Sequence, residues 1–410
     1  MSLTRRWFLA VLVVVCSAGG AAAQTSDDFF NPDGLQRIDL WLNSRDWDKL
    51  KAAFQENTYY PADVTWNGQT VRNVGIRSRG LGSRSVAKPG LRVDFDRYAT
   101  AQTFLGLKSF VLDNLSQDPS GIKETVAMRF FARMGIPTPR ETHTRLYVNG
   151  TYAGLYGLVE SVDKTMMGRV FGSIGDNVQN DGFLFEYNYV LGSEWRFEYE
   201  GSSLSRYKQR FDIKTNENKS DSTIWGPIEE LVRLVNATAS ASFEQTVGST
   251  LDLAAFVRYI AVQNFVAQDD GFNGYAGMNN FYLYRLEDST RHVFIAWDED
   301  NAFLSPEFNI ATRLNDNVLS RKTLQLPAFN AQYLSVLLEA AGSASGWLQQ
   351  EMQRQFTMIA EAMQADTVKP YSNADHAAAR DALLAFESAR VSNVRCQVAM
   401  TAGTPRPAGC

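Results

Sequence analysis

Residues 146–156 read LYVNGTYAGLY, in which two short apolar runs stand on either side of Asn149 and Gly150. An Asn-Gly pair between such runs is the strongest short-range signal for a β-hairpin, because both residues accept the positive φ angles of a tight turn. Alternating polar and apolar residues at 36–42, and more loosely at 71–77, predict further strands. The sequence therefore predicts a sheet-rich, N-lobe-like half around this hairpin, over residues 28–220.

One helix is expected to interrupt these strands. Asp118 can cap its start, Pro119 suits the first helical position, and apolar residues recur four apart after them. Gly135 is expected to end this helix. Glycines and polar residues predict a loop from 168 to 181, before a short strand at 183–185.

The pattern becomes helical from about residue 220 onward. Apolar spacing predicts helices at 254–266, 347–365 and 374–389, and two apolar runs at 281–286 and 293–297 predict a buried hairpin. A sheet-rich half followed by a helical, C-lobe-like half at 221–410 predicts an α+β, bilobal architecture. A cleft between two lobes is a common place for a ligand.

Composition limits the possible functions of the chain. Its 410 residues leave room for two or three domains, or for one large two-lobed unit. The formal net charge of −5 argues against a general nucleic-acid binder, because such proteins concentrate positive charge. With three His and three Cys in the whole chain, a His/Cys zinc site is not expected.

The first 23 residues have the features of an export signal. Arg5 and Arg6 precede a short apolar run and an A-x-A end, which predicts a signal peptide. The pair of arginines also resembles the twin-arginine type of export signal. The mature protein is expected to be periplasmic or extracellular, with no stable membrane insertion after cleavage. Cys396 and Cys410 are then the remaining cysteines, and an oxidising compartment favours a bond between them, with free thiols as the alternative.

The most distinctive polar residues lie between 268 and 301. Asp270 follows a predicted buried helix, Asn280 begins the predicted hairpin and Asp298 follows its second strand. Because a hairpin returns the end of its second strand to the start of its first, Asn280 and Asp298 are expected to lie close together. Amide and carboxylate oxygens suit Mg²⁺ or Mn²⁺ bridged to phosphates, and Asp270 could accept a proton at the same point.

A structural interpretation of these residues competes with the metal site. Asp and Asn next to glycine form turns, and a carboxylate after a strand often only caps the backbone. Three separate segments converging on one point favour the metal site over this interpretation.

A basic group occupies residues 75–85, GIRSRGLGSRS, and continues to Lys88 and Arg92. In a strand, Arg77 and Arg79 point to the same face, and the glycines and serines let backbone N–H groups approach an anion. Guanidinium groups bind phosphate oxygens in pairs. Arginines on a strand also serve simply as its solvated face, so this motif alone does not decide between the two roles.

Together and in this order, the two groups resemble the CotH kinase family. The resemblance runs from about residue 37 to residue 303, and its most specific parts are the Asn-Gly hairpin leading to Glu160 and the WDEDNAF stretch at 297–303. Other matching stretches are GIRSRG at 75–80, FLGLK at 104–108, DPSGIKE at 118–124, YVNGTYAGLYGLVESVD at 147–163, DG at 270–271 and NNFYLY at 279–284.

This resemblance implies an atypical protein-kinase-like fold that binds ATP and Mg²⁺ or Mn²⁺ and phosphorylates Ser or Thr of a partner protein. Asp270 resembles the catalytic aspartate of the family, and Asn280 and Asp298 resemble its metal-binding residues. Phosphoryl transfer mainly requires positioned groups and neutralised charge. The candidates for holding the nucleotide phosphates, or for orienting the groups that do, are Arg77, Arg79, Arg92 and Glu160, with Glu124 as an alternative to Glu160.

Two departures from the family pattern keep other functions open. Ten residues separate Asp270 from Asn280, twice the spacing of the ordinary kinase catalytic loop, and Glu186 stands where relatives often carry a basic residue. One alternative is a catalytically silent, kinase-like binding or structural protein of the cell envelope or extracellular matrix. The other is a metal-assisted hydrolase of phosphoesters or glycans.

Overall fold

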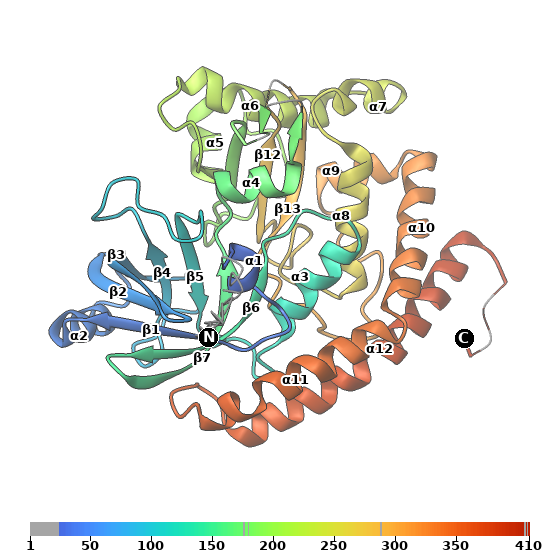
Figure 1. The fold of residues 1–410 in the computed structure, drawn as a ribbon. Coiled ribbons are helices and arrows are strands. Elements are labelled where there is room, and N and C mark those ends of the chain that lie inside the picture. Colours follow the sequence, from blue (N-terminus) through green and yellow to red (C-terminus); the bar gives the residue numbers. More distant parts are fainter. Residues whose placement is uncertain (1–23, 175–176, 179, 288, 406, 408) are drawn as a thin grey trace, which may run out of the picture.

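The N-terminal part of the chain forms a closed barrel of seven strands in a computed structural model, which describes residues 24–410 except 175–176, 179, 288, 406 and 408 (Figure 1). The predicted export signal therefore lies outside the described residues. The barrel order is β1-β2-β3-β4-β5-β7-β6. Its strands are β1 (Gln36–Leu42), β2 (Tyr60–Trp66), β3 (Gln69–Arg79), β4 (Gly90–Asp94), β5 (Ser109–Asp113), β6 (Glu141–Val148) and β7 (Thr151–Glu160).

The predicted Asn-Gly hairpin is confirmed as β6 and β7. Asn149 and Gly150 have φ angles of 50° and 80°, the left-handed pair that a two-residue turn between right-twisted strands requires. The barrel closes because β6 also pairs with β1, in parallel and in the register Ile38 opposite Leu146. Alternate residues of its strands point inward and form one buried apolar cluster.

A second sheet of four strands lies beside the barrel, in the order β11-β10-β12-β13. It contains β10 (Phe183–Tyr187), β11 (Phe211–Ile213), β12 (Phe281–Arg285) and β13 (His292–Ala296), so it draws on both sides of residue 220. Both the short strand at 183–185 and the hairpin at 281–297 are confirmed. The remaining strands, β8 (Ser173–Ile174) and β9 (Asn177–Val178), form a small separate pair.

Apolar side chains join the two sheets. The cluster between them combines residues from the outer face of the barrel, from helix α4 (Lys164–Phe171) and from one face of the second sheet, among them Val111, Val159, Met166, Leu184, Tyr282, Ile295 and Trp297. Because Val111 and Val159 alternate with inward-facing residues, the same barrel strands serve two cores. This packing fixes β5 and β7 relative to β10, β12 and β13.

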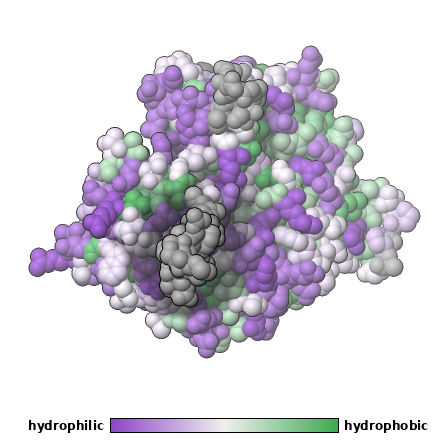
Figure 2. Space-filling model, in the orientation of Figure 1, coloured by the Kyte–Doolittle hydropathy of each residue, from purple (hydrophilic) through white to green (hydrophobic). Residues whose placement is uncertain are grey.

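Helices surround the second sheet and run along one side of the barrel, where α11 packs against β7 and α3 (Figure 1). They are α1 (Ser26–Phe29), α2 (Ser44–Ala52), α3 (Lys123–Arg133), α4 (Lys164–Phe171), α5 (Leu204–Arg210), α6 (Asp221–Ala237), α7 (Ser240–Gly248), α8 (Leu253–Phe265), α9 (Val318–Leu324), α10 (Pro327–Ala344), α11 (Trp347–Ala365) and α12 (Asn373–Ala402). Hydrophilic side chains predominate on the coloured part of the face in Figure 2. Among the described residues, no helix combines the length and apolarity needed to span a bilayer.

Three predicted elements have different bounds in the structure. The helix expected from Pro119 begins at Lys123, because Asp118 and Ser120 first form a turn, although Asp118 Oδ2 still accepts from the Lys123 N–H at 2.8 Å. The polar stretch from 168 is not all loop, since α4 extends to Phe171. The last helix continues to Ala402, well past the predicted end at 389.

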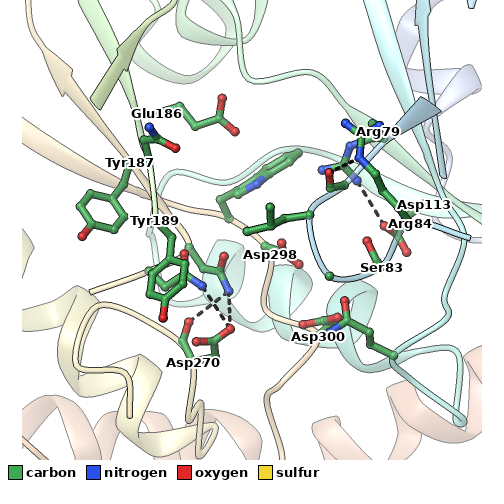
Figure 3. Close-up of a pocket in the computed structure, with 18 of the residues that line it drawn as sticks. Arg79, Ser83, Arg84, Asp113, Glu186, Tyr187, Tyr189, Asp270, Asp298 and Asp300 are labelled. Atoms are coloured by element: carbon green, nitrogen blue, oxygen red, sulfur yellow. Dashed lines mark hydrogen bonds and ion pairs between the residues drawn. The ribbon is translucent and has the colours of Figure 1, made fainter. Parts of the chain in front are cut away.

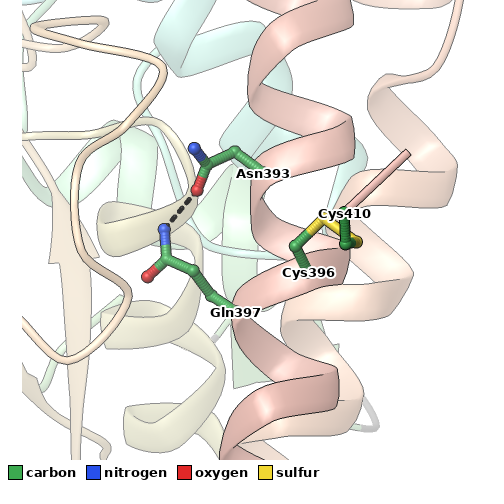
Figure 4. The surroundings of a disulfide bond; sticks show 4 residues. All are labelled: Asn393, Cys396, Gln397 and Cys410. Atoms are coloured by element: carbon green, nitrogen blue, oxygen red, sulfur yellow. Dashed lines mark hydrogen bonds between the residues drawn. A yellow bond between two sulfur atoms is a disulfide. The ribbon is translucent and has the colours of Figure 1, made fainter. Parts of the chain in front are cut away.

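The fold class is confirmed as α+β, but the sheet-rich part is not a simple antiparallel sheet. It closes into a barrel, and its β1–β6 pair is parallel. Near the C-terminus, Cys396 of α12 and Cys410 are joined by a disulfide, which ties the tail to its helix (Figure 4).

Candidate functional site

A cleft of about 650 Å³ opens where the barrel meets the second sheet (Figure 3). Arg77, Arg79 and Asp113, at the ends of β3 and β5, line its barrel side. The opposite side is lined by β10, by the loop after α8, by the start of β12 and by the segment after β13. The site is therefore assembled from segments that lie far apart in the sequence.

The structure brings the three predicted acidic-site residues to this one cleft. Asn280 precedes β12 and Asp298 follows β13, and the pairing of Phe281 with Ala296 places them at the same end of the hairpin. Asn280 Nδ2 donates to the backbone oxygen of Asp270 at 3.0 Å and lies 3.4 Å from Asp270 Oδ2. The hairpin thus holds the Asp270 carboxylate toward the cleft, as Figure 3 shows.

Negative charge is concentrated around Asp298. The pKa of Asp298 is raised to about 6, mainly by burial and also by the carboxylates of Asp113, Asp270 and Glu186, although Arg79 lowers it. Burial also raises the pKa of Asp270. Carboxylates that repel one another in a partly buried site are stabilised by a cation, so this charge distribution fits a divalent metal.

The donor set is incomplete for a metal held by the protein alone. Within the described residues, no three His, Cys, Asp or Glu side chains are arranged to hold an ion. Asp270, Asn280 and Asp298 offer two carboxylates and an amide. Mg²⁺ usually keeps several waters and is bound through one or two carboxylates plus substrate phosphates, and this set fits that pattern.

The basic side of the cleft is built from β3 and the loop after it. Arg79 Nη1 lies 3.2 Å from Asp113 Oδ2, and its guanidinium stands 5.8 Å from the centre of the Trp297 ring. Arg77 is held at 3.0 Å by the side chain of Asn57. Arg84 Nε donates to the backbone oxygen of Gly80 at 2.6 Å and so closes the loop of residues 80–84.

Two predicted residues lie elsewhere. The cleft lining in the described part of the chain includes neither Arg92 nor Glu160. Glu160 is buried and binds two other arginines, Arg140 at 2.6 Å and Arg169 at 2.5 Å. Arg92 donates to Ser109 on the neighbouring strand at 2.9 Å. The structure therefore gives both residues bonding partners away from the cleft.

Three residues that the sequence did not single out as site residues line the cleft: Asp113, Asp300 and Lys214. Asp300 belongs to the Trp-Asp-x-Asp stretch, and burial together with Asp298 raises its pKa well above the ordinary value. Asp113 ends the apolar strand SFVLD, which was a usable signal. Lys214 directly follows β11 and forms an ion pair with Glu186 of β10 at 2.5 Å, which places a positive charge beside this glutamate.

A pair of buried carboxyls, Glu124 of α3 and Glu141 of β6, lies behind the cleft. Burial raises the pKa of both well above the ordinary value near 4.5, and the negative charges of Asp113 and Asp298 raise both further. The charge of Glu141 also raises the pKa of Glu124, whereas a hydrogen bond from Glu124 lowers that of Glu141. Neither side-chain oxygen of Glu141 accepts a hydrogen bond in the described part of the chain. A proton on Glu124 would supply the missing donor, so the pair is expected to keep a proton at pH values above the ordinary pKa of a glutamate.

This pair predicts a pH dependence of stability. Because the folded state keeps a proton that the unfolded chain releases, the unfolding free energy should fall as pH rises above about 4.5, by at most about 1.4 kcal/mol per pH unit for each proton held. Melting temperatures of metal-free protein between about pH 5 and pH 8 test this. The double variant Glu124→Gln/Glu141→Gln should show a flatter profile, and parallel profiles for the two proteins would contradict the shared proton.

Comparison with known proteins identifies relatives of this chain. The sequence matches the family described as CotH kinase protein over residues 76–389. It is 24% identical over 273 residues to the inner spore coat protein H of Bacillus subtilis (strain 168), covering 66% of this chain and 69% of that protein. The crystal structure of the Golgi casein kinase aligns with 91% of this chain and 77% of its own, at 8% identity, but a TM-score of 0.29 is too low to identify a shared fold. Because the family match spans most of the chain, this protein belongs to the CotH kinase family.

Proposed function

We propose that this protein is an ATP- and divalent-metal-dependent protein kinase that transfers the γ-phosphate of ATP to Ser or Thr of a partner protein. The observation that carries the proposal is that Asp270, Asn280, Asp298 and Arg79 line one cleft between the barrel and the second sheet. Acidic groups on one wall and guanidinium groups on the other suit a nucleotide with its metal ion.

In the proposed reaction, the acceptor hydroxyl oxygen attacks the γ-phosphorus, the bond to the β,γ-bridging oxygen breaks, and ADP leaves. Asp270, whose carboxylate is oriented by Asn279 and Asn280, accepts the hydroxyl proton. Asp298 and Asn280 would hold Mg²⁺ or Mn²⁺, which neutralises charge developing on the phosphates. Arg77 and Arg79 bind phosphate oxygens, and Arg79 exchanges part of its contact with Asp113 for them.

We further propose a kinase-like, bilobal arrangement in which the barrel acts as the N-lobe and the second sheet with its helices acts as the C-lobe. Export from the cytoplasm, to the periplasm or the exterior, is also a proposal. The Cys396–Cys410 bond supports it, since structural disulfides persist in oxidising compartments.

A catalytically silent binding protein is the second candidate, and one observation favours it. Arg92 lies outside the cleft and Arg79 is already paired with Asp113, so less positive charge is available to phosphates than the sequence predicts. On this alternative the cleft would bind no nucleotide.

Nucleotide binding is therefore the first test. ATP with Mg²⁺ should raise the melting temperature of the purified protein, because a ligand that binds only the folded state stabilises it, by about 2.7 kcal/mol at a hundredfold excess over Kd. ATP without metal should give a smaller shift. No shift at millimolar Mg-ATP would contradict the kinase and favour the silent binding protein. Release of phosphate from ATP, with no labelled protein, would indicate a hydrolase.

A further inference from the structure

Three buried polar side chains connect the loop that carries Asp270 to the turn that carries Asp298. They are Gln263 of α8, Gln268 just after α8, and Glu299 after β13, and we call them the Glu299 clamp. Their exposed fractions are 3%, 4% and 0%. Because glutamates are almost never fully buried without partners, the burial of Glu299 depends on the groups that contact it.

The Glu299 carboxylate receives one hydrogen bond from each glutamine. Gln263 Nε2 donates to Glu299 Oε1 at 3.0 Å, and Gln268 Nε2 donates to Glu299 Oε2 at 2.8 Å. The side-chain oxygen of each glutamine then accepts a hydrogen bond from a backbone N–H of the loop that carries Asp270. Gln268 Oε1 accepts from the Asp270 N–H, and Gln263 Oε1 accepts from the Phe272 N–H, both at 3.1 Å.

Hydrogen bonds of the Glu299 clamp therefore run without interruption from the backbone on either side of Gly271 to the residue next to Asp298. Gly271 packs directly on the clamp, because a Cβ there would come within 2.4 Å of Gln263 Nε2. Neither glutamine lines the cleft within the described residues, so they do not contact a ligand directly.

We propose that the Glu299 clamp is a positioning device, which fixes the separation of Asp270 and Asp298 so that the proton acceptor and the metal-binding carboxylate meet one phosphate. This inference rests on the proposed function for its role in transfer. A displacement of about 1 Å at reacting groups can lower a rate about 100-fold, which makes such support necessary.

The test compares Glu299→Gln with the exchange variant Gln268→Glu/Glu299→Gln. In Glu299→Gln, the NH2 group of the new amide faces the NH2 group of Gln263 or Gln268, so two donors meet without an acceptor. The exchange variant restores one carboxyl group between the Asp270 loop and the Asp298 turn. Glu299→Gln should lower kcat about 100-fold, weaken Mn²⁺ binding measured by electron paramagnetic resonance, and speed hydrogen exchange in the segment 266–280. The exchange variant should recover all three properties. Glu351→Gln is the matched control, because Glu351 is also buried and accepts from Gln355 at 2.7 Å but lies on α11, outside the cleft lining.

Each outcome supports or overturns the proposal. Wild-type kcat, Mn²⁺ affinity and exchange in Glu299→Gln would overturn it, as would losses that persist in the exchange variant when its melting temperature has recovered. Should Glu299→Gln fail to fold, Gly271→Ala presses on the clamp without changing its three side chains and should give the same losses. Should the wild-type protein transfer no phosphate, the proposed function fails, and Mn²⁺ affinity and hydrogen exchange still decide the role of the clamp.

Discussion

Asp298→Ala is expected to abolish phosphate transfer, lowering kcat about 10³-fold or more. Asp298 is the carboxylate on which the electrostatics of the cleft converge, since Asp113, Asp270 and Glu186 all act on its pKa together with Arg79. In the proposed mechanism, a bound metal would lose a carboxylate ligand on this side, and the positive charge of Arg79 would lose a neighbour. Transfer of labelled phosphate from ATP to protein measures the effect.

Loss of folding must be separated from loss of chemistry in this experiment. Because burial and nearby carboxylates raise the pKa of Asp298, its ionised form is destabilising, and removing it should not lower the melting temperature of the metal-free protein. Asp381→Ala is the control, since Asp381 is an exposed carboxylate of α12 that forms an ion pair with its neighbour Arg380. Labelling by Asp298→Ala at the wild-type rate would remove the proposed mechanism.

The parts of the fold that sequence predicts well are those that depend on neighbouring residues. The Asn149-Gly150 turn is confirmed because its φ angles are a local property. The 281–297 hairpin and the helix at 347–365 are likewise confirmed, since their apolar pattern is contained within one segment. The proximity of Asn280 and Asp298 followed from the predicted hairpin, because its register alone places Asn280 beside the end of β13.

Barrel closure is a property that no single segment contains. It depends on the pairing of β1 with β6, whose partners Ile38 and Leu146 lie far apart in the sequence and could equally occupy an open sheet. Asp113 and Lys214 reach the cleft through such distant pairings. Residue type is also ambiguous. Arg92 has the positive charge that a phosphate site needs, and Glu160 has the negative charge that could orient such an arginine, but both residues form structural bonds instead.

Lys88 shows the same ambiguity with a measurable consequence. By sequence, Lys88 belongs to the basic group that begins in β3. In the structure its side chain is 1% exposed and lies 2.7 Å from the fully buried side chain of Asp366. Asp366 follows α11, and its carboxylate also accepts from the N–H groups of Leu155 and Val368 at 3.1 and 3.0 Å. The pair therefore fastens the barrel to the C-terminal helices.

Asp366→Ala is expected to lower the unfolding free energy by about 3–5 kcal/mol, because it leaves the Lys88 ammonium buried without its partner. Chemical denaturation measures this. Glu361→Ala is the matched control, since Glu361 also links α11 to the barrel, through Arg145 at 2.6 Å, but is 88% exposed, and an exposed pair contributes less than about 1 kcal/mol.

Lys88→Met together with Asp366→Asn should recover more than half of the lost stability, since no uncompensated charge then remains buried. The amide oxygen can still accept from the Val368 N–H, while the Leu155 N–H loses its acceptor. If Asp366→Ala lowered the unfolding free energy no more than Glu361→Ala does, Lys88 would have found water or another partner. The pair also supports the cleft, because Asn114 donates from one nitrogen to the backbone oxygens of Lys88 and Ser83, both at 2.8 Å. Asp366→Ala should therefore also weaken Mg-ATP binding, and the double variant should restore it.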